Sequence, residues 1–247
     1  LSEKIIKHDW PRPVKIFGYD DTYGIEGDIF EAETNCYHDH EAGQIASETP
    51  NLSYFSSKTK NSIQQNPNPK IIYNESKTYI GLIVGDGDNI GMVKNSRHEW
   101  MKQRIDHCKN ITCYPLIWTL SGHLSYLAPE ILSWYSEQSK ITTMDYFILP
   151  PSGYLYAYPS EMSEQVQTLY IEKTLEQSRI LDTNGMVDWE WFYDWKKAYN
   201  YYAMYNETMG IFTTNVPFNI PLSFGTYGYK IFNNVVAFEP REWRGTK

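Results

Sequence analysis

The sequence predicts an α/β fold with a mostly parallel sheet, and three observations support this class. Short apolar runs rich in β-branched residues alternate about seven times with helical stretches or long connections. One run, residues 79–84, is almost unbroken in its apolar character, as expected for a strand that is covered on both faces. Several runs end directly in acidic residues, and sites in α/β proteins lie at the carboxyl ends of strands. We therefore expect one α/β domain over residues 1–247.

The composition restricts the classes of partner. Apolar residues make up 41% of the chain, and no run approaches the roughly 20 apolar residues of a membrane span, so we expect a globular protein without one. The net charge is -8 and no basic cluster is longer than a pair, which argues against nucleic acid because phosphate binding requires a positive face. Aromatic residues make up 16%, and their flat amphipathic rings suit sugar faces, although most are expected to pack in the core and its rim.

The cysteines and histidines indicate neither a disulfide scaffold nor a metal centre. Three cysteines are too few for a scaffold, although Cys108 and Cys113 are near enough in sequence for a local bridge, which would leave Cys36 without a partner. No CxxC pair or HExxH helix is present, and His38 and His40 fit a solvated loop better than a metal site. We expect no metal and no cofactor.

Four glycosylation sequons favour the secretory pathway or the cell exterior. A chain in that compartment would offer N-glycan acceptors at Asn51, Asn74, Asn110 and Asn206. The chain begins with Leu1 rather than Met, so we expect a mature product or a fragment from which a targeting segment could have been lost.

The expected elements follow from apolar patterning and from capping residues. In the first half we predict strands at residues 14–19 and 51–56, a short helix at 28–34, and a proline-punctuated loop at 57–76. After the strand at 79–84 we predict a helix at 99–109, a strand at 114–120 and a helix opened by Pro129. The remainder comprises a strand at 146–149, a helix from the N-cap Ser160 to about residue 181, a helix at 188–205, and strands at 211–214 and 235–238.

The motif DGDN directly follows the apolar run at 79–84. Asp86 and Asp88 supply two carboxylates and Asn89 an amide, on a turn that Gly87 makes flexible. This placement is typical of a functional site at the carboxyl end of a strand. A polar turn, whose Asp and Asn side chains bind their own backbone, explains the same residues. The spacing alone leaves both interpretations open.

A second motif resembles a known family signature. Gly153, Tyr156, Tyr158 and Pro159 match the GxGYxYP pattern, and Leu155 stands where that pattern has its second glycine. IVGDGDNI resembles the family's strand ending in DGDN, and WTLSGHLSYLAPEILSWY resembles the stretch between the two motifs. The similarity is densest over residues 79–159, and the ordered combination of motifs is specific.

The resemblance implies a TIM-barrel-like catalytic domain of a glycoside hydrolase that acts on a carbohydrate, and a missing upstream domain. Glycoside hydrolysis uses two carboxyl groups, ~5 Å apart for retention of configuration or ~6.5–9.5 Å for inversion. Carboxylates that follow predicted strands are the catalytic candidates, namely Asp20 (or its neighbour Asp21), Asp86, Asp88 and Glu239. Asp86 and Asp88 are two residues apart on a tight turn, so we expect only one of them to be catalytic.

Substrate-binding candidates accompany these acids. Tyr154, Tyr156 and Tyr158 alternate, so on an extended chain they would share one face and leave Leu155 pointing into the core. A tyrosine row suits stacking on sugars, but a packed aromatic rim is the alternative. The full set of binding candidates is Asn89, His123, Ser152, Tyr154, Tyr156 and Tyr158.

The alternative function is a non-catalytic carbohydrate-binding or structural surface glycoprotein on the same fold. Leu155 favours this alternative, because a leucine in place of glycine could alter the backbone path near the site. A hydrolase that uses Asp86 and Asp88 to hold a divalent cation has less support, since only oxygen ligands are in view. A serine hydrolase is disfavoured because the sequence contains no GxSxG elbow.

Overall fold

Strands and helices alternate in the part of the chain that carries the DGDN motif. The computed structural model describes residues 54, 57–58, 61–68, 71–72, 74–77, 79–157, 159, 162–188, 209–212, 229–232 and 235–238. The chain divides into two compact units. The first unit comprises Pro50–Pro150 and Leu175–Gly185, and the second comprises Leu1–Thr49, Pro151–Thr174 and Met186–Lys247. The expectation of one domain stays a prediction.

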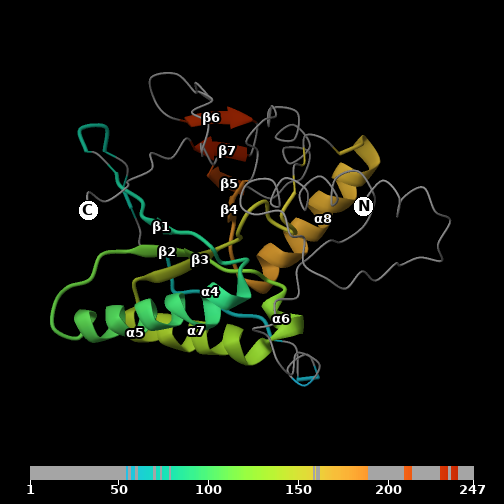
Figure 1. Ribbon diagram of the computed structural model, residues 1–247. Helices are drawn as coiled ribbons and strands as arrows, with labels where there is room; N and C mark the ends of the chain where they lie inside the picture. The colour runs from blue at the N-terminus through green and yellow to red at the C-terminus, as the bar shows by residue number, and fades with distance from the viewer. Residues whose placement is uncertain are drawn as a thin grey trace, which may run out of the picture. The chain divides into compact units, whose positions relative to one another are not determined.

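The first unit contains a three-stranded parallel sheet with the order β1-β2-β3. Figure 1 shows its helices α5 and α7 side by side, and α7 packs against β3. The strands are β1 (Ile83–Val84), β2 (Leu116–Thr119) and β3 (Asp145–Ile148), and the helices between them are α4 (Ile90–Lys94), α5 (Ser96–Cys108), α6 (Leu124–Leu127) and α7 (Pro129–Thr142).

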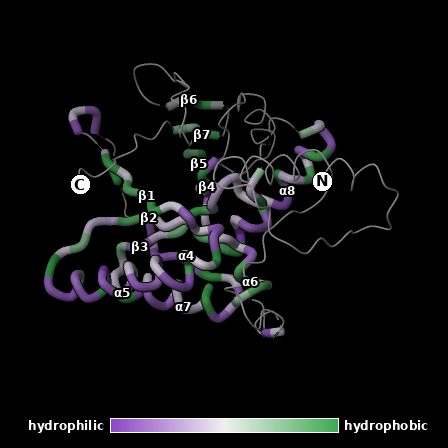
Figure 2. Tube along the Cα trace, in the orientation of Figure 1, coloured by the Kyte–Doolittle hydropathy of each residue, from purple (hydrophilic) through white to green (hydrophobic). Residues whose placement is uncertain are grey.

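Helix α7 begins where the sequence predicts. Pro129 occupies its first turn, where a missing N–H costs no helical hydrogen bond. Leu132 and Tyr135 follow at helical spacing and are fully buried, and the ring of Tyr135 meets Phe147 of β3 edge-on at 6.4 Å. Figure 2 shows hydrophobic and hydrophilic residues alternating along α5 and α7, as in helices that cover a sheet with one face only.

The amino ends of β2 and β3 are held by a buried carboxylate. The side chain of Asp145 accepts hydrogen bonds from Arg104 Nε and Trp118 Nε1, each at 2.7 Å, and a third from the Thr142 hydroxyl. Asp145 is the first residue of β3, one position before the strand predicted at 146–149. The charge is tolerated in the core because each carboxylate oxygen has a partner.

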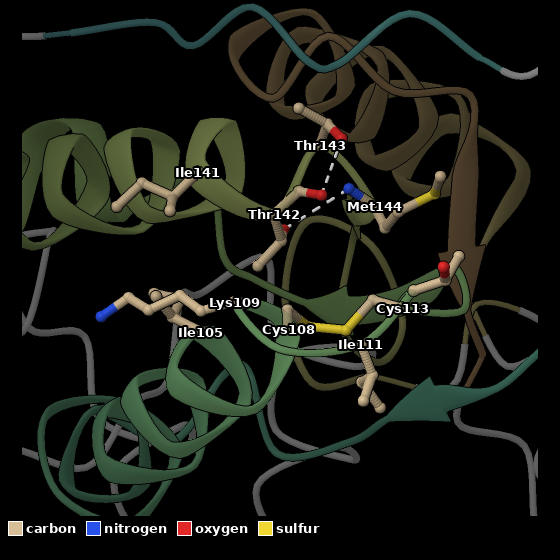
Figure 3. Close-up of a pocket in the computed structure, with 10 residues that line it drawn as sticks. Ile105, Cys108, Lys109, Ile111, Cys113, Ile141, Thr142, Thr143 and Met144 are labelled. Atoms are coloured by element: carbon tan, nitrogen blue, oxygen red, sulfur yellow. Dashed lines mark hydrogen bonds between the residues drawn. A yellow bond between two sulfur atoms is a disulfide. The ribbon is translucent and has the colours of Figure 1, made fainter.

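The expected local disulfide forms between Cys108 and Cys113 and closes the connection from α5 to β2. Figure 3 shows it among the residues that line a cavity, together with Ile105, Thr142 and Met144. The volume of this cavity is about 270 Å³. This cavity lies at the amino ends of β2 and β3, whereas sites in α/β proteins form at the carboxyl ends.

The segment before β1 is a loop, as predicted, and its amides bind the sheet. Gln65 pairs with the backbone of Phe147 in both directions, since its Nε2 donates to the carbonyl and its Oε1 accepts from the N–H, each at 2.7 Å. Buried Asn66 donates to the carbonyls of Ser139 and Asp145. The Gln65 side-chain amide therefore makes the pair of hydrogen bonds to β3 that the backbone of a neighbouring strand would make.

The second unit contains a four-stranded sheet with the order β4-β5-β7-β6. β7 has the predicted bounds and β5 begins two residues earlier than predicted, whereas β4 and β6 are additions. β5 runs parallel to β7 and β6 antiparallel to it, so the sheet is mixed. The strands are β4 (Gly185–Val187), β5 (Met209–Phe212), β6 (Tyr229–Phe232) and β7 (Val235–Phe238), and helix α8 (Glu164–Ile180) precedes them.

The run at residues 79–84 differs from its prediction. Only Ile83 and Val84 pair with β2, while Tyr79 is 46% exposed and Ile80 is 81% exposed. The prediction of a strand covered on both faces is therefore wrong, because apolar composition indicates a residue's fit to a pleated surface and not whether other parts of the chain cover it. Among the described strands, β1 stands at one end of the order β1-β2-β3.

The α/β class is confirmed, and the described strands show no closed barrel. The strands predicted at 14–19 and 51–56 and the helices predicted at 28–34 and 188–205 lie outside, or almost entirely outside, the described residues. None of the described helices is long and apolar enough to cross a membrane.

Candidate functional site

The DGDN turn is packed tightly onto the end of β2. Gly87 donates its N–H to Thr119 Oγ1 at 2.9 Å, and the Ser121 N–H donates to the Gly87 carbonyl at 3.1 Å. A Cβ at position 87 would lie 2.0 Å from the carbonyl oxygen of Thr119. Only glycine fits this approach of two backbones, so Gly87 anchors the turn rather than making it flexible.

Two carboxylates emerge from this anchored turn. Asp86 and Asp88 flank buried Gly87 and are both exposed to solvent. Asp86 adopts a left-handed conformation with φ of 59°, which aspartate tolerates better than most residues. The turn therefore presents charged groups to solvent from a backbone that is held on its buried side.

Asn89 has a structural role. Its Oδ1 accepts the Met92 N–H at 3.1 Å and so caps the N-terminus of α4. The interpretation of DGDN as a turn that binds its own backbone therefore holds for Asn89.

Arg97 of α5 holds the same turn from inside the protein. Its side chain is fully buried and donates to the carbonyl of Gly85, to Thr119 Oγ1 at 3.2 Å and to the Thr119 carbonyl at 2.5 Å. The guanidinium also lies over the ring of Trp118, 5.5 Å from its centroid. The sequence prediction missed Arg97 because it stands in the polar stretch SRHEWMKQR, which is typical of a solvated helix face.

The electrostatics of Arg97 reflect its burial. Desolvation lowers the pKa of the Arg97 guanidinium, and this effect is opposed by Tyr135 and by the charges of Asp86 and Asp88. Burial likewise raises the pKa of the Tyr135 hydroxyl to about 12, against the opposing effect of Arg97. That hydroxyl donates to the Val93 carbonyl at 2.6 Å, which connects α7 to α4.

His123 belongs to the segment that contacts the DGDN turn. The Ser121 hydroxyl accepts the His123 N–H at 3.2 Å and lies 3.5 Å from His123 Nδ1. Because the Ser121 N–H binds Gly87, the structure brings this segment to the same edge of the sheet as Asp86 and Asp88. Ser121 was missed as a site residue, although it follows a predicted strand as Asp86 does.

The tyrosine motif is a compact loop, so the prediction of an extended row is wrong. The Ser152 N–H reaches back to the Leu155 carbonyl at 2.9 Å, and the buried Ser152 hydroxyl donates to the Ala157 carbonyl at 2.7 Å. Tyr154, Leu155 and Tyr156 all pack against one cluster rather than alternating between faces; its buried members are Ala157, Met162 and Tyr170. Local hydrogen bonds that close the loop override the alternation that an extended chain would give.

Leu155 fits this loop without a left-handed backbone. Its N–H donates to the Tyr170 hydroxyl at 3.1 Å, and that hydroxyl donates to the Leu155 carbonyl at 2.5 Å. Gly153 is the residue with positive φ, at 98°, and a Cβ there would meet Thr174 Cγ2 at 2.5 Å. The first glycine of the motif is therefore required by the backbone, whereas leucine is accommodated at the second position.

Asp188 is a buried carboxylate that the prediction did not assign to a site. It directly follows β4, and its N–H donates to the Phe212 carbonyl at 3.0 Å. The signal was present, since Met186 and Val187 precede it just as an apolar run precedes Asp86. The sequence pattern instead predicts a helix that begins at residue 188.

Several predicted site residues lie outside the described residues, namely Asp20, Tyr158 and Glu239, and so do Cys36, His38 and His40. Asp86 and Ser152 belong to different units, so the expectation that the candidates share one cleft stays a prediction. Within the described part of the chain, no group of three or more His, Cys, Asp or Glu side chains is arranged to hold a metal ion.

The fold and this turn define an α/β protein with exposed carboxylates at the carboxyl end of a parallel sheet. The model of the GxGYxYP putative glycoside hydrolase C-terminal domain matches residues 76–233. This match covers more than half of the chain, so the protein belongs to the GxGYxYP family. A search of curated proteins found no match.

A solved structure supports this assignment. The crystal structure of a putative hydrolase from Bacteroides thetaiotaomicron VPI-5482 is 32% identical and superposes with a TM-score of 0.56. The similarity covers 66% of this chain and 31% of that one, so the chain spans about a third of the relative's length.

A matched pair of glycine variants tests the anchoring of the turn. Gly87→Ala forces a methyl group into the Thr119 backbone and should destabilise the protein by about 2 kcal/mol or more. Gly85→Ala places its methyl group where no atom lies within 4 Å and should change stability by less than about 1 kcal/mol. Urea denaturation measures both, and equal losses would contradict the proposed contact.

The raised pKa of Tyr135 predicts a loss of stability at alkaline pH. An unfolded tyrosine titrates near pH ~10, whereas the folded hydroxyl keeps its proton until about pH 12. The stabilisation is therefore fully present below pH ~10 and is lost as the pH rises through about 12. Tyr135→Phe should flatten the fall in unfolding free energy across this window, while Tyr114→Phe, at an exposed position, should keep the wild-type slope. Identical slopes for the two variants would contradict the assignment.

Proposed function

We propose that this chain forms part of a glycoside hydrolase that cleaves a carbohydrate with a carboxylate of the DGDN turn. The observation that carries this proposal is the exposed pair Asp86 and Asp88 on a backbone anchored through Gly87. Hydrolases require reactive groups held to within about 0.5 Å, and such groups need a rigid support. The close contact between Gly87 and the Thr119 backbone gives the turn such a support.

One carboxylate of the turn serves as nucleophile or base. The second carboxyl group, which protonates the leaving oxygen, comes from another strand end, as in other α/β glycosidases. Asp20 and Glu239 are the candidates for that role. His123 and the exposed edge of the turn supply hydrogen bonds to sugar hydroxyls.

The proposed compartment is the secretory pathway or the cell exterior. The Cys108–Cys113 disulfide supports it, because such bonds persist in oxidising compartments. Asn110 lies inside the loop that this disulfide closes, and both Asn110 and Thr112 of its sequon are exposed. Asn74 is exposed as well, so both are plausible acceptors for N-glycans.

The alternative is a carbohydrate-binding protein without turnover. Its basis in the sequence was Leu155, which we expected to alter the backbone path. Leu155 has no positive φ and packs with its neighbours, so the structure gives no sign that it distorts the loop. The geometry thus favours the hydrolase.

Neutral variants of the two aspartates test the proposal. We expect the wild-type chain to cleave at least one substrate in a panel of aryl glycosides and oligosaccharides. Asp86→Asn or Asp88→Asn should lower kcat at least ~100-fold, because a general base or nucleophile is lost, with the melting temperature unchanged within a few degrees. The control is Asp182→Asn, which changes another aspartate in the left-handed region, with φ of 51°, and should keep full activity.

The outcomes separate the two functions. A wild-type chain that binds glycans and cleaves none is the carbohydrate-binding protein. A chain that neither binds nor cleaves any member of the panel contradicts both proposals. Loss of folding in the Asp86 and Asp88 variants would favour a purely structural turn.

A further inference from the structure

Arg97 is an unusual buried cation. In the described part of the chain no carboxylate forms a salt bridge with its guanidinium, and its Nε has no hydrogen-bond partner. Burying a charge costs several kcal/mol unless partners compensate it, and a well-packed neutral side chain often stabilises a core equally well. Arg104 on the same helix has the usual arrangement, with its Nε 2.7 Å from the Asp145 carboxylate.

We propose that Arg97 is a positioning residue, which fixes the direction of the Asp86 and Asp88 carboxylates by binding the Gly85 carbonyl directly and Gly87 through the Thr119 hydroxyl. The inference rests on the proposed function of this turn. Arg97 is fully buried, so it acts through the segments that it binds and not by touching a substrate.

The hydrogen bonds of Arg97 bracket Asp86. The guanidinium binds the carbonyl of Gly85, the residue immediately before Asp86. It also binds the Thr119 hydroxyl, which accepts the N–H of Gly87, the residue immediately after Asp86. The same hydroxyl donates to the Val84 carbonyl at 3.1 Å. Both neighbours of Asp86 are therefore connected to the planar guanidinium of Arg97. Because a guanidinium has several N–H groups in fixed directions, it defines the orientation of the turn as well as its distance from α5.

The charge of Arg97 interacts with the same two carboxylates. The charges of Asp86 and Asp88 favour the protonated guanidinium and so oppose the effect of burial, which lowers the pKa of Arg97. A neutral side chain of similar length would fill the space but would supply neither the N–H donors nor the positive charge of the guanidinium.

Substitution of two arginines of α5, the buried Arg97 and the partly buried Arg104, tests the inference. Arg97→Met should lower kcat about 100-fold with KM changed less than about threefold, because misplacement of a reactive group by about 1 Å affects the reaction step. Arg97→Lys keeps the charge and loses the planar guanidinium, so it should give an intermediate kcat. Arg104→Met breaks the ion pair with Asp145 at the other end of the sheet; it should lower the melting temperature and leave kcat per folded molecule unchanged.

Amide hydrogen exchange gives a readout that needs no activity. In Arg97→Met the amides of Gly87 and Ser121 should exchange at least ~10-fold faster relative to the amide of Leu149, whereas Arg104→Met should leave this ratio unchanged. A wild-type exchange ratio in Arg97→Met overturns the inference, and so does an equal loss of kcat in both methionine variants. If the wild-type chain cleaves no glycoside, the proposed function fails, and the exchange ratio still decides whether Arg97 positions the turn.

Discussion

The contact between the backbones of Gly87 and Thr119 determines where the two carboxylates of the DGDN turn, Asp86 and Asp88, lie. It joins the turn after β1 to the end of β2, and it leaves no room for a side chain at position 87. Arg97 binds both segments from below, and Asn89 directs the chain into α4. The exposed residues Asp86 and Asp88 therefore flank a buried residue, Gly87, whose backbone is bound to Thr119.

The two ends of the three-stranded sheet use arginines of α5 in different ways. At the amino ends, Arg104 pairs with Asp145 inside a network that includes Trp118, which is an arrangement suited to stability. At the carboxyl ends, Arg97 binds the backbone oxygens of Gly85 and Thr119, and in the part of the chain that the structure describes it forms no salt bridge. This asymmetry agrees with the general rule that such sheets keep function at the carboxyl ends and stability at the amino ends.

Sequence patterns predicted the local features of the fold and missed those that depend on distant contacts. Pro129 marked the start of α7, Cys108 and Cys113 formed the expected bridge, and β7 has its predicted bounds. Residues 79–84 were expected to be buried, yet coverage depends on other segments of the chain. Arg97 looked like a surface residue because its partners lie 12 and 22 positions away. Turn bonds that no alternating pattern encodes override the predicted tyrosine row.

Amide chemical-shift mapping tests directly whether carbohydrate binds at the anchored DGDN turn. Cello-, xylo- and malto-tetraose would be titrated separately into the isotope-labelled chain. A bound tetraose should shift the amides of residues 86–89 and 121–123 most strongly. Shifts confined to the cavity beside Cys108 and Cys113, with the turn unaffected, would contradict this prediction.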